Sequence, residues 1–159
     1  MSLLATYLND HLAAATAGRD LARRTASSNL GNERYGPATQ RLAAEIDEDR
    51  EALLAVMRAL GVGEDRLKVA AAWTAEKIGR LKPNGRLLSY SPLSRLIELE
   101  GMTLGVRGKL AMWESLMAIA PQEARLDEAE LERLETRARA QLEILEELRL
   151  EASGEGLLG

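Results

Sequence analysis

Apolar residues recur at alternating four- and three-residue spacing along four separate stretches of this chain, and this pattern constrains its fold more than any other feature. Side chains at such spacing share one face of an α-helix, and helices that each bury one face pack together as a bundle. The clearest stripes are Leu42, Ile46, Leu53, Val56 and Leu60 in the second stretch, and Leu131, Leu134, Ala138, Leu145 and Leu148 in the fourth. The pattern predicts an all-α protein.

Capping residues set the ends of the first two predicted helices. Ser2 is a good N-cap for a helix that reaches residues 25–28. Pro37 suits the first position of a second helix, which stops at Gly61. Because the loop between them is short, we expect these two helices to be antiparallel neighbours.

The third and fourth helices carry comparable signals. Ser91 followed by Pro92 begins a long helix, and Pro121 ends it. Asp127, with Glu130 three residues later, resembles the start of a capping box. We expect residues 1–153 to form a single domain and residues 154–159 to be a flexible tail.

The connector at residues 61–91 decides the predicted topology. It contains a shorter helix at about residues 65–81, followed by the turn signature Pro83-Asn84-Gly85. Its ~25 Å of helix and ~30 Å of extended chain can span a bundle helix ~40 Å long. The sequence therefore predicts an antiparallel four-helix bundle in which one long, helix-containing crossover makes the second and third helices parallel. The alternative is a fifth helix packed across one end.

Two helical hairpins, a long connection and interior carboxylates make the chain resemble the ferritin-like superfamily. The runs at residues 73–86 and 90–95 are also similar to those of uncharacterised bacterial proteins of this shape. Metal-binding members place a Glu on two helices and a Glu-x-x-His pair on the other two. In this chain residues 45–48 and 143–146 read Glu-x-x-Glu, and the only histidine is His11. The resemblance therefore implies a member that lacks the di-iron motif.

Ionisable residues interrupt the apolar stripes and predict a polar interior. Asp49 lies between Ile46 and Leu53, and the third helix carries three charged residues at seven-residue intervals. Arg suits buried pairing with a carboxylate, so we expect Asp49 and Arg107 to meet. The predicted polar core or ligand site comprises His11, Glu45, Asp49, Glu100, Arg107 and Glu114. It is interpreted either as a structural ion-pair network or as a ligand pocket.

The third helix also contains Gly101, Gly105 and Gly108. Each glycine costs ~1 kcal/mol relative to Ala within a helix, so some other interaction should offset that cost. Close packing of helix backbones is the favoured explanation. The alternatives are room for a ligand and a subunit interface.

Basic residues cluster in the middle of an otherwise acidic chain. Residues 66–95 hold seven basic groups and one acid, whereas the whole chain has a net charge of −4. Arg80, Lys82 and Arg86 form a candidate anion-binding surface. The favoured alternative is that this segment lies across the acidic helices and neutralises them.

The composition of the chain excludes some kinds of functional site. The chain has no Cys, and so no disulfide or thiolate site. We expect no signal peptide at the N-terminus, and no apolar run approaches the ~20 residues that span a membrane. We predict a cytoplasmic bacterial protein, homodimeric and without a cofactor, that acts as a non-catalytic binding or interaction module. A small-molecule ligand is possible, and nucleic acid is the less favoured partner. The alternatives are a carboxylate-bridged di-iron or di-manganese oxidoreductase and anion or nucleic-acid binding through the basic crossover.

Overall fold

The structure is a computed structural model that describes residues 2–65 and 90–158. Within these ranges the chain forms four α-helices and one short 3-10 helix, with no strand. The elements are α1 (Leu3–Ser28), α2 (Gly36–Ala59), α4 (Pro92–Ile119), η1 (Ala120–Gln122) and α5 (Glu128–Leu158). The prediction of an all-α protein is confirmed. The basic residues Arg80, Lys82 and Arg86, and almost all of the predicted connector helix, lie outside the described residues.

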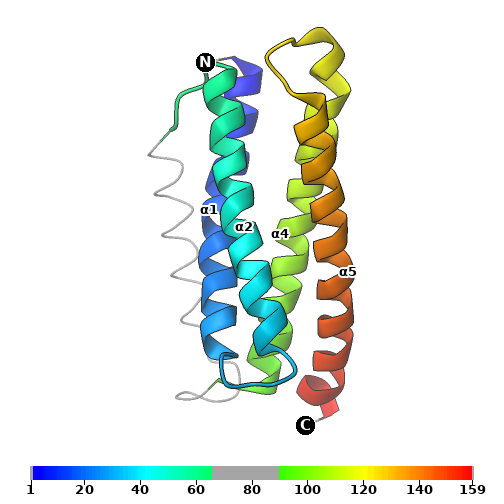
Figure 1. Cartoon of the computed structure of the whole chain (residues 1–159). Helices are drawn as coiled ribbons and strands as arrows, with labels where there is room; N and C mark the ends of the chain where they lie inside the picture. Colours follow the sequence, from blue (N-terminus) through cyan, green and yellow to red (C-terminus); the bar gives the residue numbers. More distant parts are fainter. Residues whose placement is uncertain (1, 66–89, 159) are drawn as a thin grey trace.

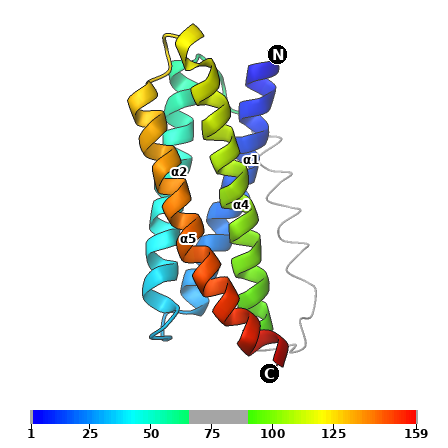
Figure 2. The same ribbon diagram turned by 90° about the vertical axis from the view of Figure 1, so that its right-hand side faces the viewer.

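The four long helices lie side by side (Figures 1 and 2). Helix α1 begins at the end of the molecule where α2 finishes and where α4 passes into α5. Helix α4 begins at the opposite end, near the C-terminus. The most extensive packing joins α4 to α5, α1 to α2 and α1 to α4, whereas α2 and α5 touch only sparsely.

The first hairpin begins and ends at the predicted caps. The Ser2 hydroxyl accepts a hydrogen bond of 3.1 Å from the backbone N–H of Ala5. Helix α2 has Pro in its first turn and ends at Ala59, two residues before Gly61, which has a φ of 69°. There the Val62 N–H donates to the carbonyl of Met57 at 2.8 Å, which is the closing bond of a Schellman motif.

The second hairpin begins at predicted residues but extends farther than expected. Ser91 caps α4 through its hydroxyl, and Asp127 Oδ1 accepts from the Glu130 N–H at 3.2 Å. Helix α5 then continues through Leu158, where we had expected a flexible tail from residue 154. The last turns have partners on α4, because Arg95 Nη1 lies 2.8 Å from a carboxylate oxygen of Glu155.

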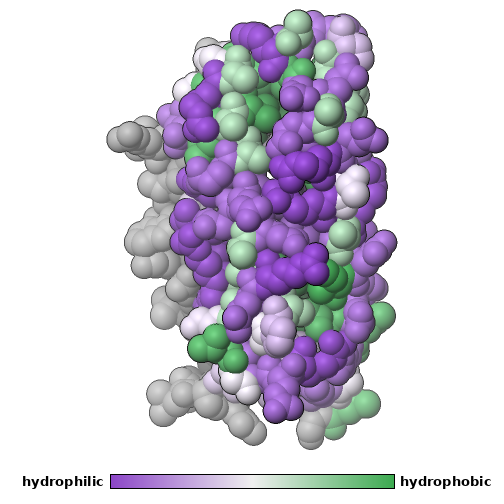
Figure 3. All heavy atoms as spheres, viewed as in Figure 1, coloured by the Kyte–Doolittle hydropathy of each residue, from purple (hydrophilic) through white to green (hydrophobic). Residues whose placement is uncertain are grey.

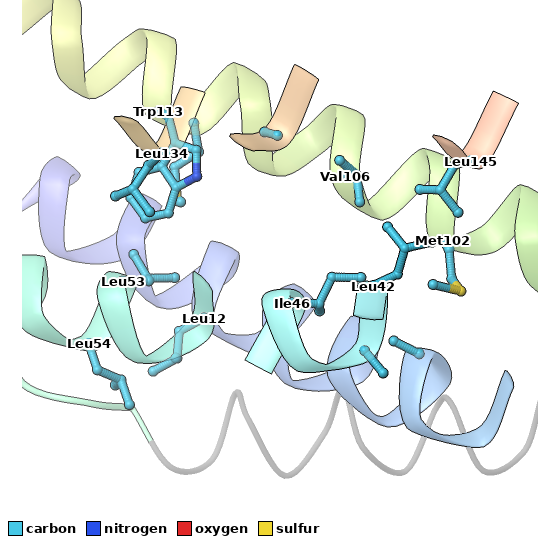
Figure 4. Packing of buried hydrophobic residues seen from close by; sticks show 14 of the residues in the cluster. Leu12, Leu42, Ile46, Leu53, Leu54, Met102, Val106, Trp113, Leu134 and Leu145 are labelled. Carbon is cyan, nitrogen blue, oxygen red and sulfur yellow. The ribbon is translucent and has the colours of Figure 1, made fainter. Parts of the chain in front are cut away.

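Aliphatic side chains and Trp113 form a continuous core between the helices. Trp113 is fully buried, and Figure 4 shows it pointing from α4 towards the interior, with Leu53 of α2 across from it. The buried stripe of α4 is Leu96, Leu99, Met102, Val106, Trp113 and Leu116. Leu110 and Met117 of the same helix are only partly buried and pack against the edge of this core.

The outer surface seen in Figure 3 is mostly hydrophilic, and its apolar side chains are gathered in small areas. No helix in the described part of the chain is long and apolar enough to cross a membrane.

Candidate ligand-binding site

One buried carboxylate joins three helices. Asp49 projects from α2, and its side chain is 3% exposed. Its Oδ1 accepts a hydrogen bond from Arg137 Nη2 of α5, and its Oδ2 accepts one from Lys109 Nζ of α4. Gln141 Nε2 of α5 donates to the same Oδ2 at 3.1 Å. Two cations and an amide therefore occupy both oxygens of this buried carboxylate.

A second layer of polar groups surrounds Asp49. Gln141 accepts from Lys109 Nζ at 2.5 Å through Oε1 and donates to Glu45 Oε2 at 3.1 Å through Nε2. Arg137 Nη1 donates to Glu48 at 2.8 Å. Burial lowers the pKa of the Lys109 ammonium, and the Asp49 carboxylate opposes that shift. The result is a buried ion-pair network with its outer acids at the solvent-facing edge.

A cavity of about 190 Å³ that is partly open to solvent lies against this network, between α1, α2 and α4. Asp49 and Lys109 form part of its wall, and His11 and Arg50 contribute the other charged or titratable groups. The remaining wall is apolar or lacks a side chain, and comprises Ala14, Ala15, Gly18, Ile46, Leu53, Met102, Leu104, Gly105, Val106, Gly108, Met112 and Trp113. Such a mixture of apolar walls and a few convergent polar groups is typical of small-molecule sites.

The glycines create much of this space. A Cβ atom built on Gly18, Gly105 or Gly108 would meet no atom within 4 Å. Among the glycines of α4, a Cβ would collide at Gly101, with Leu21 Cδ2 at 2.9 Å. The expectation of close backbone packing therefore holds at Gly101, whereas Gly105 and Gly108 make room beside the polar network.

Two donors beside the cavity have unused capacity. Trp113 Nε1 is buried and has no hydrogen-bond partner in the described part of the chain. Arg50 donates through Nε to the Thr16 hydroxyl at 3.1 Å and through Nη1 to Glu51 at 2.9 Å. A buried indole N–H without a partner costs free energy.

His11 lies on the α1 side of the cavity. Its ring meets the Tyr7 ring edge to face, with the centroids 4.6 Å apart. Partial burial lowers the pKa of His11, and the charge of Asp10 opposes that shift. The imidazole is therefore neutral at physiological pH.

Three of the six predicted site residues belong to this region, and three do not. His11 and Asp49 line the cavity, and Glu45 belongs to the polar network. Glu100, Arg107 and Glu114 are exposed, so the prediction that they enter the interior is wrong. Residues at positions 107 and 109 are separated by about 200° around a helix, so the true phase of α4 turns Lys109 inward and Arg107 outward.

Lys109, Arg137, Gln141 and Trp113 are the site residues that the sequence analysis missed. The spacing of the fourth helix indicates Gln141, because this residue fills the gap between Ala138 and Leu145 in the predicted stripe. The spacing of the third helix indicates Lys109 less clearly, since this residue lies three residues after Val106 and four before Trp113. No spacing pattern indicates Arg137, which is adjacent to Ala138.

In the di-iron or di-manganese alternative, the metal ligands would be Glu45, Asp49 and Glu100 with His11. In residues 2–65 and 90–158, no three His, Asp or Glu side chains gather in a way that could hold an ion. Glu100 is exposed, and Asp49 is already neutralised by Lys109 and Arg137. These positions do not fit a carboxylate-bridged metal centre.

Comparisons with protein families, with curated proteins and with solved structures find no match to this chain.

Proposed function

We propose that this chain is a non-catalytic, ferritin-like binding protein that holds a small molecule in the cavity between α1, α2 and α4. The observation that carries the proposal is the largely apolar pocket beside Asp49 and Lys109, between α1, α2 and α4. The proposed bundle topology is supported by the views in Figures 1 and 2, in which α2 and α4 point towards the same end.

The energetics of the cavity favour an occupant. Helical glycines at positions 105 and 108 cost ~2 kcal/mol together, and no neighbouring atom uses the space they leave. Both glycines are exposed, so a ligand in this pocket would cover them and gain dispersion contacts with the apolar residues of the wall.

The state of Asp49 supports a binding role over a catalytic one. Both of its oxygens accept hydrogen bonds from cationic groups, so it has little capacity to take a proton from a substrate. Its companion Lys109 is held by Asp49 and Gln141. The pair therefore serves as a fixed polar wall.

The homodimer and the anion-binding crossover remain predictions. Leu104 and Ile97, at 72% and 43% exposed, give α4 an apolar surface that a second copy could cover. Light scattering across a concentration series measures the oligomeric state directly.

The proposal is tested by the fluorescence of Trp113 in a chain that carries Trp73→Phe, titrated with toluene as an apolar probe. We expect saturable quenching and a rise in Tm, because a ligand that binds only the folded state stabilises it. Val106→Phe, at a buried wall position, should abolish both effects. Val56→Phe on α2 is the matched control, since Val56 packs against the core but does not line the cavity. Equal responses from the two variants would contradict the proposal.

A further inference from the structure

We infer that two copies of this chain associate through the outward face of α4, with the two α4 helices antiparallel and the two-fold axis beside Leu104. This inference rests on the homodimer of the proposed function and names its interface, and it does not depend on whether the pocket holds a ligand. The shape of the face and its charge support the inference separately.

The outward face of α4 carries an uncharged stripe. Helix α4 packs against α1 on one side and α5 on the other, which leaves the rest of its surface on the outside of the bundle (Figure 2). The stripe follows four- and three-residue spacing along about 27 Å of helix, a pattern by which one helix packs along another. Its members are Ile97, Gly101, Leu104, Gly108, Ala111 and Ser115.

The shape of this face is complementary to itself. Leu104 projects from it and is 72% exposed. Gly105 and Gly108 leave the neighbouring surface low, because a Cβ atom on either would meet no atom within 4 Å. Helical side chains lean towards the N-terminus of their own helix, so in an antiparallel pair Leu104 of each copy would lie over the partner's Gly108. A two-fold interface requires such a reciprocal fit, and glycine lets two backbones approach closely.

Two charged residues beside the stripe give the pair its direction. Glu100 and Arg107 are exposed and lie seven residues apart, so they border the same side of the stripe. Neither forms an ion pair within the described part of the chain. The charges of α5 that act on them, Arg149 and Glu146, are bonded to each other at 2.8 Å.

A two-fold axis beside Leu104 would pair these free charges twice. In the antiparallel arrangement, Glu100 of each copy comes beside the partner's Arg107, because the two positions lie at nearly equal distances on either side of the axis. A parallel pair would instead bring residues of the same number side by side, and this cross pairing would not form. The charges therefore favour the antiparallel arrangement.

The first test measures the dimer Kd of the full chain by sedimentation equilibrium, without a pocket ligand because Leu104 also borders the pocket. Glu100→Lys and Arg107→Glu should each raise Kd at least about tenfold, since each sets like charges together at two contacts. The double variant should recover the original Kd, because it restores both pairs with the signs exchanged. Arg58→Glu is the matched control, since Arg58 is exposed on α2.

The second test reads the direction of the pair from disulfides, which is possible because the chain has no Cys of its own. Residues 97 and 111 lie at equal distances along the sequence from Leu104, on opposite sides. An equal mixture of Ile97→Cys and Ala111→Cys chains should therefore oxidise mainly to the mixed dimer, which mass spectrometry identifies. Each variant oxidised alone should give little covalent dimer.

The outcomes separate this inference from the proposed function. A dimer whose Kd is unchanged by both charge reversals would overturn the α4 interface and leave the homodimer intact. A chain that stays monomeric at every concentration would overturn both, while the toluene titration would still decide whether the pocket binds a ligand. Disulfides that form within each Cys variant, and not between the two, would overturn the antiparallel arrangement.

Discussion

Asp49 forms buried ion pairs with both Lys109 and Arg137, so its replacement is the sharpest test at the scale of a single residue. Asp49→Asn should lower the free energy of unfolding by about 3–5 kcal/mol, because Lys109 and Arg137 would lose their buried counter-charge. Glu114→Gln is the matched control. It breaks an ion pair with Arg139 whose two side chains are about half exposed, and it should cost no more than about 1 kcal/mol. Urea unfolding measures the free energy of unfolding of both variants. Similar small losses in the two variants would mean that the buried ion-pair network contributes little to stability.

His11 gives the second prediction at this scale, a dependence of stability on pH. Since folding lowers the pKa of His11, the unfolded chain binds more protons between that lowered pKa and the ordinary value of about 6.5. Stability should therefore rise with pH through this window and fall on acidification from about pH 7.5 to about pH 5.5.

The measurement is the urea midpoint at the two pH values, combined with NMR titration of the His11 ring. His11→Gln should flatten this part of the profile, because the variant has no group that titrates there. An unchanged profile in the variant would assign the dependence to other groups.

At the scale of the element, helix α4 combines two kinds of glycine. Gly105→Ala should raise the free energy of unfolding by about 1 kcal/mol, because its Cβ would enter open space and the helix would gain intrinsic propensity. Gly101→Ala should gain less or nothing, since Leu21 Cδ2 lies 2.9 Å from the new Cβ and must move. Chemical denaturation of the two variants side by side gives the comparison. Equal gains would show that the Leu21 side chain yields without cost.

The sequence analysis did not predict correctly which face of α4 points towards the interior. Capping signals located the helix correctly at Ser91 and Pro92, but a helix with apolar residues on much of its circumference has no single obvious stripe. The charged repeat at positions 100, 107 and 114 is exposed, and it lies near charged residues of α5. Burial of the Lys109 ammonium is stabilised by hydrogen bonds to Asp49 and Gln141. Both acceptors come from other helices.

At the scale of the whole molecule, the direction of α2 relative to α4 can be measured by spin-label distances, since the chain has no Cys of its own. Labels at Gln40→Cys and Ile97→Cys should lie closer together than labels at Gln40→Cys and Ser115→Cys. The reason is that the ribbons in Figures 1 and 2 run α2 and α4 from the same end. All three positions are exposed, and dilution with unlabelled chain removes distances between copies. The opposite order of distances would exclude a long crossover between the hairpins.

The sequence by itself determined the helices, because caps and spacing act within a few residues: Ser2, Gly61, Ser91 and Asp127 have the roles expected of them. It also marked Asp49 as an interior charge and His11 and Glu45 as its neighbours. Only the tertiary structure decided which cation meets Asp49 and whether the glycines close a gap or open one. Both depend on how helices distant in sequence are rotated against each other, and local spacing does not encode that rotation.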